Sequence, residues 1–169
     1  LIAKHYTKEE FAWIMQDWAN SVYSLMITTA IFPLYFKTVS SNAGLSAADS
    51  TAFLGYANSI ATFAVSIMAP VLGALADYKG YRNPMFTWST LLGVFSVIGM
   101  MFAETDQWIL LLALYTLSAI GYSASNIFYD SSIMDVTTYD RMDRISAAGY
   151  GYGYIGSVFP FVLFMMIMQ

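Results

Sequence analysis

Long stretches without charged residues alternate with short charged segments along this chain. Five stretches are long enough for a helix that crosses a bilayer, which needs about 20 apolar residues. Because the hydrocarbon layer holds no water, backbone N–H and C=O groups there must bond within a helix or a closed barrel. Barrel strands would appear as short alternating segments, and the chain shows none. We therefore predict an all-α membrane protein, a helical bundle with five transmembrane helices in one domain over 1–169. The predicted spans are about 12–36, 51–77, 84–103, 107–135 and 145–169.

The composition narrows the possible classes of function. Hydrophobic residues make up 58% of the chain and charged residues only 11%, whereas a soluble domain carries about 25% charged residues. With no Cys and one His, His5, we expect neither a thiolate nor a histidine metal site. The net charge of −4 comes without a basic patch, and no nucleophile, base and acid stand together in any span. We expect no enzyme, no cofactor, no metal and no nucleic-acid partner.

Lysine and arginine are unequally distributed between the two sides that the spans define. If the sides alternate along the chain, six of the 7 Lys and Arg residues lie on the side of the N-terminus. The six are Lys4, Lys8, Lys79, Arg82, Arg141 and Arg144, and Lys37 lies on the other side. Because cytoplasmic loops are enriched in Lys and Arg, we expect the N-terminus and the loops at 77–84 and 136–144 in the cytoplasm. The loop at 37–49 would then be extracytoplasmic, with a short helix capped by Ser46.

Polar residues inside the spans are candidates for a solute cavity, because polar groups are costly there and generally face water or a partner. In the first span they recur three and four residues apart, on one helical face. Similar stripes suggest that spans one, two, four and five line an aqueous path, with span three peripheral. The candidates for the cavity or for coupling are Asp17, Asn20, Ser21, Ser24, Asn58, Tyr122 and Asn126. The alternative is that such side chains only join helices. For Asp17 and Asn20 together we favour the cavity, since a carboxylate beside an apolar run needs water or a partner.

Four glycines in the fifth span, Gly149, Gly151, Gly153 and Gly156, superficially look like a phosphate-binding loop. The dinucleotide fingerprint needs a strand before its glycines, and these glycines lie inside an apolar run. We predict that they allow close packing between helices instead.

The turn between the second and third spans concentrates charge in a short segment. Residues 73–82 read Gly-Ala-Leu-Ala-Asp-Tyr-Lys-Gly-Tyr-Arg. We expect Gly73 to let two helices approach closely, and Gly80 to permit a tight reversal. Asp77 would mark the point where a helix leaves the membrane, and the two bases after it would meet water or lipid phosphate.

The pattern Gly-x-Leu-Ala-Asp-x-x-Gly-x-Arg in this turn resembles the signature loop of the major facilitator superfamily (MFS) of transporters. Further stretches are similar to one subgroup, the vacuolar amino-acid effluxers of autophagy and their bacterial relatives. They are Asp-Trp-Ala-Asn-Ser-Val-Tyr at 17–23, Ala-Ile-Phe-Pro-Leu-Tyr-Phe at 30–36, Pro-Val-Leu-Gly-Ala-Leu-Ala-Asp at 70–77, Phe-Tyr at 128–129, Asp135, Arg-Ile-Ser at 144–146 and Gly-Tyr-Gly-Tyr-Gly-Tyr-Ile-Gly at 149–156. The stretch 137–143 departs from this likeness, because it carries two acids and a base where we expect a loop richer in Glu and Pro.

The resemblance implies about twelve spans in two halves, alternating access and a solute site near the membrane midplane. This chain would be most of the N-terminal half, and the C-terminal half of the same protein or a second copy would complete it. The implied function is a secondary active transporter that exports an amino acid or similar metabolite. It would lie among the lipids of a bacterial cytoplasmic membrane. A cation-coupled sugar symporter and a non-transporting assembly or receptor module are the alternatives.

The signature turn also suggests a cytoplasmic gate. Asp130 and Asp135 stand near the cytoplasmic end of the fourth predicted span. We predict that Arg82 pairs with one of them, Asp130 first, within the roughly 6 Å over which opposite charges strongly favour each other. The resemblance implies that Asp77 faces the N-terminus of a helix in the other half, where the helix dipole favours its charge. The predicted gating motif comprises Gly73, Asp77, Gly80, Arg82, Asp130 and Asp135.

Overall fold

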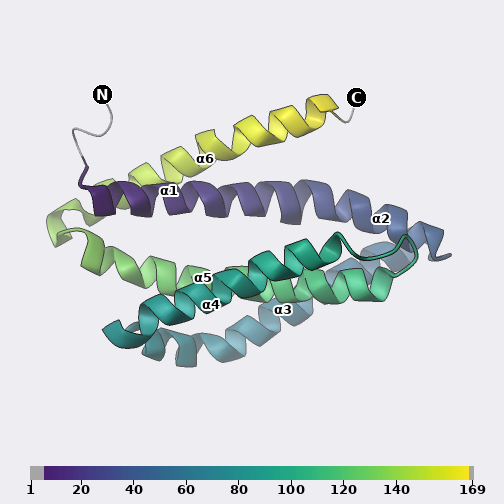
Figure 1. The fold of residues 1–169 in the computed structure, drawn as a ribbon, viewed down its shortest axis with the longest axis horizontal. Coiled ribbons are helices and arrows are strands. Elements are labelled where there is room, and N and C mark those ends of the chain that lie inside the picture. Colours follow the sequence, from purple (N-terminus) through teal and green to yellow (C-terminus); the bar gives the residue numbers. More distant parts are fainter. Residues whose placement is uncertain (1–5, 168–169) are drawn as a thin grey trace. The chain divides into compact units, whose positions relative to one another are not determined.

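The computed structural model describes residues 6–167, except for the side chain of Lys79. It is 89% helical, with no strand among the described residues, which confirms the predicted all-α class (Figure 1). The elements are α1 (Lys8–Tyr23), the π-helix η2 (Ser24–Ile31), α2 (Phe32–Asn42), α3 (Ala47–Ala76), α4 (Lys79–Met100), α5 (Trp108–Val136), the short 3₁₀ helix η3 (Tyr139–Arg141) and α6 (Met142–Ile167). The predictions for Lys4 and His5, and for the last two residues of the fifth span, lie outside the described residues.

Within residues 6–167, four helical stretches are long and apolar enough to cross a membrane. They are Lys8–Asn42, Ala47–Ala76, Trp108–Val136 and Tyr139–Ile167. The first is longer than the predicted 12–36, because α1, η2 and α2 follow one another without a break. The helix that corresponds to the predicted third span, α4, has 22 residues and is not among the four. Its first turn carries two charged residues of the signature turn, Lys79 and Arg82.

The chain divides into two compact units. The first unit comprises the described residues within 1–32 and 132–169, which include α1, η2, the end of α5, η3 and α6. The second comprises 33–131, which include nearly all of α2, then α3, α4 and most of α5. The first unit therefore joins segments from the two ends of the chain, which the hydrophobic pattern alone does not reveal.

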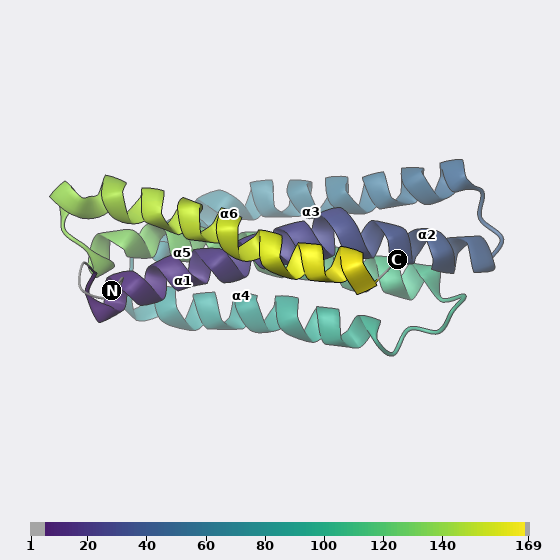
Figure 2. The same cartoon turned by 90° about the horizontal axis from the view of Figure 1, so that it is seen from above.

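In the first unit, α1 and α6 run side by side in the same direction (Figures 1 and 2). Glycines on α6 allow this close approach. A Cβ atom added at Gly149 would lie 3.0 Å from Oδ2 of Asp17, and one at Gly153 would lie 2.5 Å from Oγ of Ser21. Small residues at a helix interface permit such short separations between backbones.

The same interface continues one turn further along α6. A Cβ atom at Gly156 would overlap the indole ring of Trp18. At Gly151, by contrast, a Cβ atom would meet nothing within 4 Å. The predicted role in close packing is therefore confirmed for Gly149, Gly153 and Gly156. Within this chain Gly151 packs against no other helix, because that residue lies on a different face of α6.

A capping box opens α1. The Thr7 hydroxyl accepts a hydrogen bond from the Glu10 backbone N–H (3.2 Å), and the Glu10 carboxylate accepts one from the Thr7 backbone N–H (2.9 Å). This reciprocal pair satisfies two donors that a helix start otherwise leaves without partners. The sequence Thr-x-x-Glu therefore fixes where the first helix begins.

In the second unit, α4 and α5 approach each other at two glycines, Gly93 and Gly121. A Cβ atom at Gly121 would lie 2.6 Å from the backbone N of Gly93 and 2.8 Å from the backbone O of Ser89. Backbone atoms of a packed helix cannot swing aside as a flexible side chain can, so the crossing depends on the missing side chain. Alongside, α3 packs on α5 through a small apolar core of Leu72, Ala76, Ala124 and Phe128.

The turn between α2 and α3 is shorter than the predicted loop over 37–49. Gly44 has a positive φ of 85°, and its backbone N–H donates to the Ser41 carbonyl (3.0 Å), as in a glycine-terminated helix end. Ser46 caps a helix, as predicted, but that helix is the 30-residue α3 rather than a short loop helix. A buried hydrogen bond of 2.7 Å from Ser40 to Ser50 ties α2 to α3. The loop was overestimated because its Ser and Asn residues lie on the last turns of α2.

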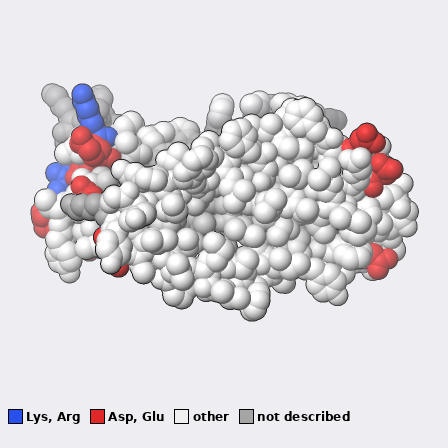
Figure 3. Space-filling model, turned by 60° about the horizontal axis from the view of Figure 1, so that its bottom comes forward, with Lys and Arg blue, Asp and Glu red and all other residues white. Residues whose placement is uncertain are grey.

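Charged side chains on the face drawn in Figure 3 gather at the ends of the elements. The broad surface between them shows no Lys, Arg, Asp or Glu among the described residues. Such a surface suits the hydrocarbon layer, since charges are costly there.

The distribution of Lys and Arg predicts opposite sides of the membrane for Ser41 and Asn83, which are both exposed. We expect Ser41→Cys to react with an impermeant thiol reagent added to intact cells, and Asn83→Cys to react only after the cells are opened. The chain has no Cys of its own, and any Cys elsewhere in the reading frame would be replaced by Ser, so that each label reports one position. The reverse labelling pattern would contradict the cytoplasmic N-terminus.

Candidate functional site

The signature turn is built from two helix ends in direct succession. Helix α3 ends at Ala76, Asp77 forms its C-cap, and Tyr78 adopts an extended conformation (φ −91°, ψ 112°) before α4 begins at Lys79. Arg82 is buried, and its Nε donates a 2.7 Å hydrogen bond to the Ala76 carbonyl oxygen. A cation at a helix C-terminus satisfies a free carbonyl and meets the negative end of the helix dipole. Arg82 therefore holds the end of α3 against the start of α4.

The two glycines of the turn do not have the roles that the sequence suggested. Gly80 lies in the first turn of α4 and does not have a positive φ, so Asp77 and Tyr78 form the reversal instead. A Cβ atom at either Gly73 or Gly80 would meet nothing within 4 Å. Within this chain, neither glycine therefore serves a close approach. The reversal needs no glycine because the extended backbone of Tyr78 redirects the chain.

The predicted partners of Arg82 are exposed side chains on α5. Asp130 lies in the last residues of the second unit, and Asp135 lies in the first unit, near the end of α5. The pairing of Arg82 with either carboxylate stays a prediction.

The polar stripe of the first span faces α6 over part of its length. Asp17 and Ser21 lie against the glycines of α6, as described above. Asn20 is 8% exposed, and its Oδ1 accepts a long hydrogen bond of 3.5 Å from Gln16 Nε2. Ser24 opens the π-helix η2, and its backbone oxygen accepts a 3.0 Å hydrogen bond from the Thr29 hydroxyl. Within the first unit, the structure thus brings Asp17 and Ser21 together at one helix interface.

The candidates in the second unit belong to α3 and α5. The Tyr115 hydroxyl, on a fully buried side chain, donates a 2.9 Å hydrogen bond to Asn58 Oδ1 and so joins these two helices. Tyr122 and Asn126 are half-buried on α5. Other members of the stripe on α5 are buried, namely Tyr115, Ser118, Ser125 and Tyr129. Asn58 thus has a structural partner, which favours the helix-joining interpretation for this residue.

A buried carboxylate that the sequence interpretation missed stands at the start of α1. Glu10 is 2% exposed, and its Oε1 accepts a 2.7 Å hydrogen bond from the Thr137 hydroxyl. Its Oε2 lies 2.8 Å from Nη2 of Arg141, in an ion pair. This carboxylate therefore ties the start of α1 to the segment between α5 and α6. Its capping box was visible in the sequence, but its partners 127 and 131 residues away were not.

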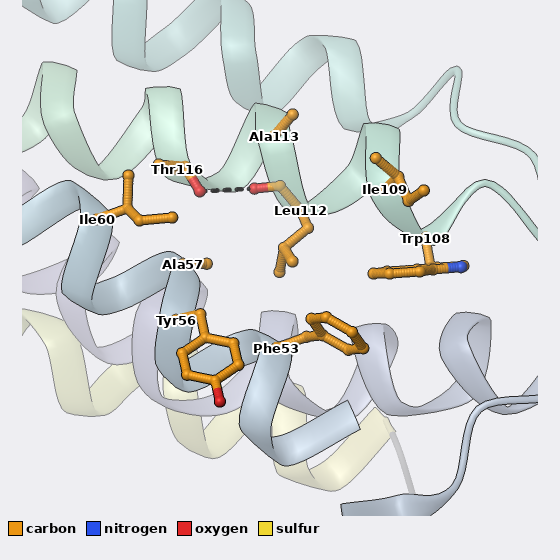
Figure 4. Close-up of a pocket in the computed structure, with 9 residues that line it drawn as sticks. All are labelled: Phe53, Tyr56, Ala57, Ile60, Trp108, Ile109, Leu112, Ala113 and Thr116. Atoms are coloured by element: carbon orange, nitrogen blue, oxygen red, sulfur yellow. Dashed lines mark hydrogen bonds between the residues drawn. The ribbon is translucent and has the colours of Figure 1, made fainter. Parts of the chain in front are cut away.

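An apolar groove of about 540 Å³ lies between α3 and α5 in the second unit (Figure 4). Its lining comprises Phe53, Tyr56, Ala57, Ile60, Trp108, Ile109, Leu112, Ala113 and Thr116. The Thr116 hydroxyl points to the Leu112 carbonyl, to which it donates a 2.8 Å hydrogen bond. A groove lined in this way offers apolar contact rather than recognition of a charged solute.

Comparisons with known proteins agree with this helical, membrane-embedded design. A family profile described as "Vacuole effluxer Atg22 like" matches residues 6–169. YxiO of Bacillus subtilis (strain 168), named as an uncharacterized MFS-type transporter, is 46% identical over 165 residues. That alignment covers 98% of this chain but 39% of the relative, so the chain spans well under half of the relative's length. No solved structure matches the chain.

The family and the relative are transporters rather than enzymes, and the apolar helices make this an integral membrane protein. The chain belongs to the vacuole effluxer Atg22-like family of MFS-type transporters.

Proposed function

We propose that this chain forms the N-terminal bundle of a secondary active transporter, which exports an amino acid or similar small metabolite by alternating access. The observation that carries the proposal is the family match over residues 6–169, nearly the whole chain. The signature turn adds support, because Arg82 joins α3 to α4 by its bond to Ala76 and so forms a rigid corner. Movement of two bundles about a central cavity needs such rigid parts and no chemical step.

Two other functions would use a similar bundle. A cation-coupled sugar symporter would share the superfamily, but its coupling would favour extra acidic residues within the second span. Between its first turn and its C-cap Asp77, α3 has no acidic residue. A non-transporting assembly or receptor module would have polar stripes that face only other helices, as Asn58 does toward Tyr115.

Labelling from water separates a transporter from such a module. Single cysteines at Ser24, Tyr122 and Asn126 would be placed in the longest reading frame that encodes this chain. An aqueous path predicts that water-soluble thiol reagents reach all three positions in the folded protein. A matched cysteine at Ser118, which is 0% exposed, should remain unlabelled. Protection at all positions would contradict the transport proposal.

Asp17 is the carboxylate that we propose for gating or coupling. It lies against the backbone of α6 at Gly149, so its access to water depends on the contact between α1 and α6. A carboxylate whose hydration changes between two states binds a proton more readily in the enclosed state. The alternative is a structural role in the first turns of the span.

We expect Asp17→Asn to transport solute in reconstituted vesicles while losing the pH dependence of the rate, since the amide keeps the shape but cannot take up the proton. The transport rate would be measured between about pH 5 and 8, a range in which an enclosed carboxyl group can take up or release a proton. Asp106→Asn, at an exposed residue before α5, is the control and should keep the normal pH profile. If Asp17→Asn also keeps both its rate and its pH dependence, the residue is structural.

The proposed gate predicts an energetic coupling between Arg82 and Asp130. In a double-mutant cycle with Arg82→Gln and Asp130→Asn, we expect a coupling of about 0.5–3 kcal/mol, as for residues in contact. The free energy of unfolding in micelles provides the measurement. The same cycle with Asp135→Asn should show a smaller coupling, because we place Asp130 first. Strict additivity in both cycles would rule out the pairing.

A further inference from the structure

In the middle of the first span the backbone hydrogen bonds change pattern. In an α-helix each N–H donates to the carbonyl four residues back (the α register), whereas in a π-helix it donates five residues back (the π register). Over Ser24–Ile31, eight residues form a π-helix, between α1 and α2, which are both α-helical. The Phe32 backbone N–H donates to the Ile27 carbonyl, five residues back. The Thr29 hydroxyl donates to the Ser24 carbonyl, also five residues back (3.0 Å). Because π-helical segments are rare and generally span a single turn, one of this length requires an explanation.

The local sequence weakens the α register. Ile27, Thr28 and Thr29 are consecutive β-branched residues, whose side chains crowd the preceding helical turn. Pro33 follows closely, and in an α-helix its ring would press against the Thr29 carbonyl four residues back. These two features raise the energy of the α register without excluding it.

Proline also removes one backbone hydrogen bond whichever register forms. In the α register the Thr29 carbonyl would lack its donor, and in the π register the Thr28 carbonyl would lack it. The number of backbone hydrogen bonds lost at Pro33 is therefore the same. The Thr29 hydroxyl bond to Ser24 is then one of the few features that favour the observed register.

Within this chain, side-chain packing does not hold the segment in one register either. No residue of Ser24–Ile31 is fully buried, whereas Asn20 before it and Phe32 after it are buried. A packed core is what normally holds a helix in a single arrangement. Without it, two registers of similar energy can interconvert.

We propose that Ser24–Ile31 switches between the observed π register and an α register. In the α register Ser24 neighbours Ile27, three residues along the chain, whereas in the π register it gains Thr29, five residues along. The switch therefore exchanges an apolar neighbour of Ser24 for a hydroxyl near the middle of the span. The inference concerns the helix itself and holds whichever solute the protein carries.

Pairs of cysteines that bind Cd²⁺ can report the register, because two neighbouring thiolates hold a soft metal ion. The chain has no Cys, and any Cys elsewhere in the reading frame would be replaced by Ser, so that each introduced pair is the only pair of thiols. Leu25→Cys with Ala30→Cys, five residues apart, reports the π register, and Ser24→Cys with Ile27→Cys reports the α register; both pairs keep the Thr29 hydroxyl. The binding constants would be measured by Cd–thiolate absorbance, with the full reading frame in lipid nanodiscs.

Matched pairs in α3 calibrate the two spacings in an ordinary α-helix. Ser59→Cys with Thr62→Cys, three residues apart, should bind Cd²⁺, and Ser59→Cys with Ala64→Cys, five apart, should not. A second α-register pair, Leu25→Cys with Thr28→Cys, replaces the Ile27 pair if that variant does not fold. Melting curves of all variants would confirm that each is folded.

We expect both registers to bind, with affinities within about a hundredfold of each other, since a dissociation constant rises in inverse proportion to the population that binds. If the α-register pairs bind no better than the 59/64 pair, the π register is fixed and the proposal is wrong. If the 25/30 pair binds no better than the 59/64 pair, the π register does not form. Neither outcome depends on transport, so failure here is separate from failure of the proposed function.

Discussion

Gly121→Ala is expected to lower the free energy of unfolding by about 2–3 kcal/mol or more, the upper range for overpacked cores. The new methyl group would lie 2.6 Å from the backbone N of Gly93 and 2.8 Å from the backbone O of Ser89. These atoms belong to the hydrogen-bonded backbone of α4 and cannot move aside. The steric clash is therefore relieved only if the two helices separate. Separation in turn would loosen the contacts that α5 makes along its length. The measurement is the thermal or denaturant unfolding of the purified protein in micelles.

Two glycines provide matched controls for this substitution. At Gly93, on the facing helix, a Cβ atom would lie 3.6 Å from both the Ser118 O and the Tyr122 N, an ordinary contact. At Gly55 a Cβ atom would meet nothing within 4 Å, so Gly55→Ala should stabilise α3 slightly through its higher helix propensity. Equal melting temperatures for Gly121→Ala and Gly55→Ala would contradict the close crossing of α4 and α5.

Glu10→Ala is expected to lower the free energy of unfolding by about 2–3 kcal/mol, as for hydrogen bonds that involve a buried charge. The substitution removes the acceptor of three donors, namely the Thr7 backbone N–H, the Thr137 hydroxyl and Arg141 Nη2. The Arg141 side chain is 36% exposed, so water can replace part of its lost interaction. The start of α1 would then separate from the segment that precedes α6.

Glu9→Ala is the matched control, because Glu9 is the adjacent acidic residue of the same first turn but is exposed. We expect a change within about 0.5 kcal/mol, as for surface substitutions. A cycle with Arg141→Met should show that the losses at Glu10 and Arg141 are not additive. Equal effects of Glu9→Ala and Glu10→Ala would show that Glu10 acts only through the helix dipole.

The helical class and the packing face of α6 were predictable because both depend on local patterns. Apolar runs of sufficient length must be helical in a bilayer. Glycines spaced by three and four residues lie on one helical face, and the structure shows Gly149, Gly153 and Gly156 there. Gly151 breaks that spacing, which is why no helix of this chain packs against it.

Features that depend on a distant partner were not predictable in the same way. The sequence shows that Glu10 caps a helix, but only the fold shows that Thr137 and Arg141 approach it. Likewise, the sequence does not distinguish Gly121 from other glycines in apolar runs, and only the fold shows that the backbone of Gly93 lies opposite it. The π-helix had weaker signals, β-branched residues before Pro33, which many ordinary helices also carry.

The signature turn shows how a motif can be recognised while its physical roles are misassigned. The pattern of the turn pointed to the correct superfamily, and Arg82 does lie at a structural joint. We inferred, however, that Gly80 makes the reversal, as glycine does in many tight turns. The structure instead makes the reversal with Asp77 and Tyr78, and a side chain at Gly80 would meet open space.

Solute efflux from reconstituted vesicles tests the central claim most directly. Vesicles that contain the longest reading frame with this chain would be loaded with a panel of labelled amino acids and sugars, and efflux would be followed with and without a proton gradient. The account predicts that at least one amino acid leaves faster than from protein-free vesicles, and that Gly121→Ala slows this efflux. If no amino acid leaves faster than from protein-free vesicles, or only a sugar does so, the amino-acid export proposal is contradicted.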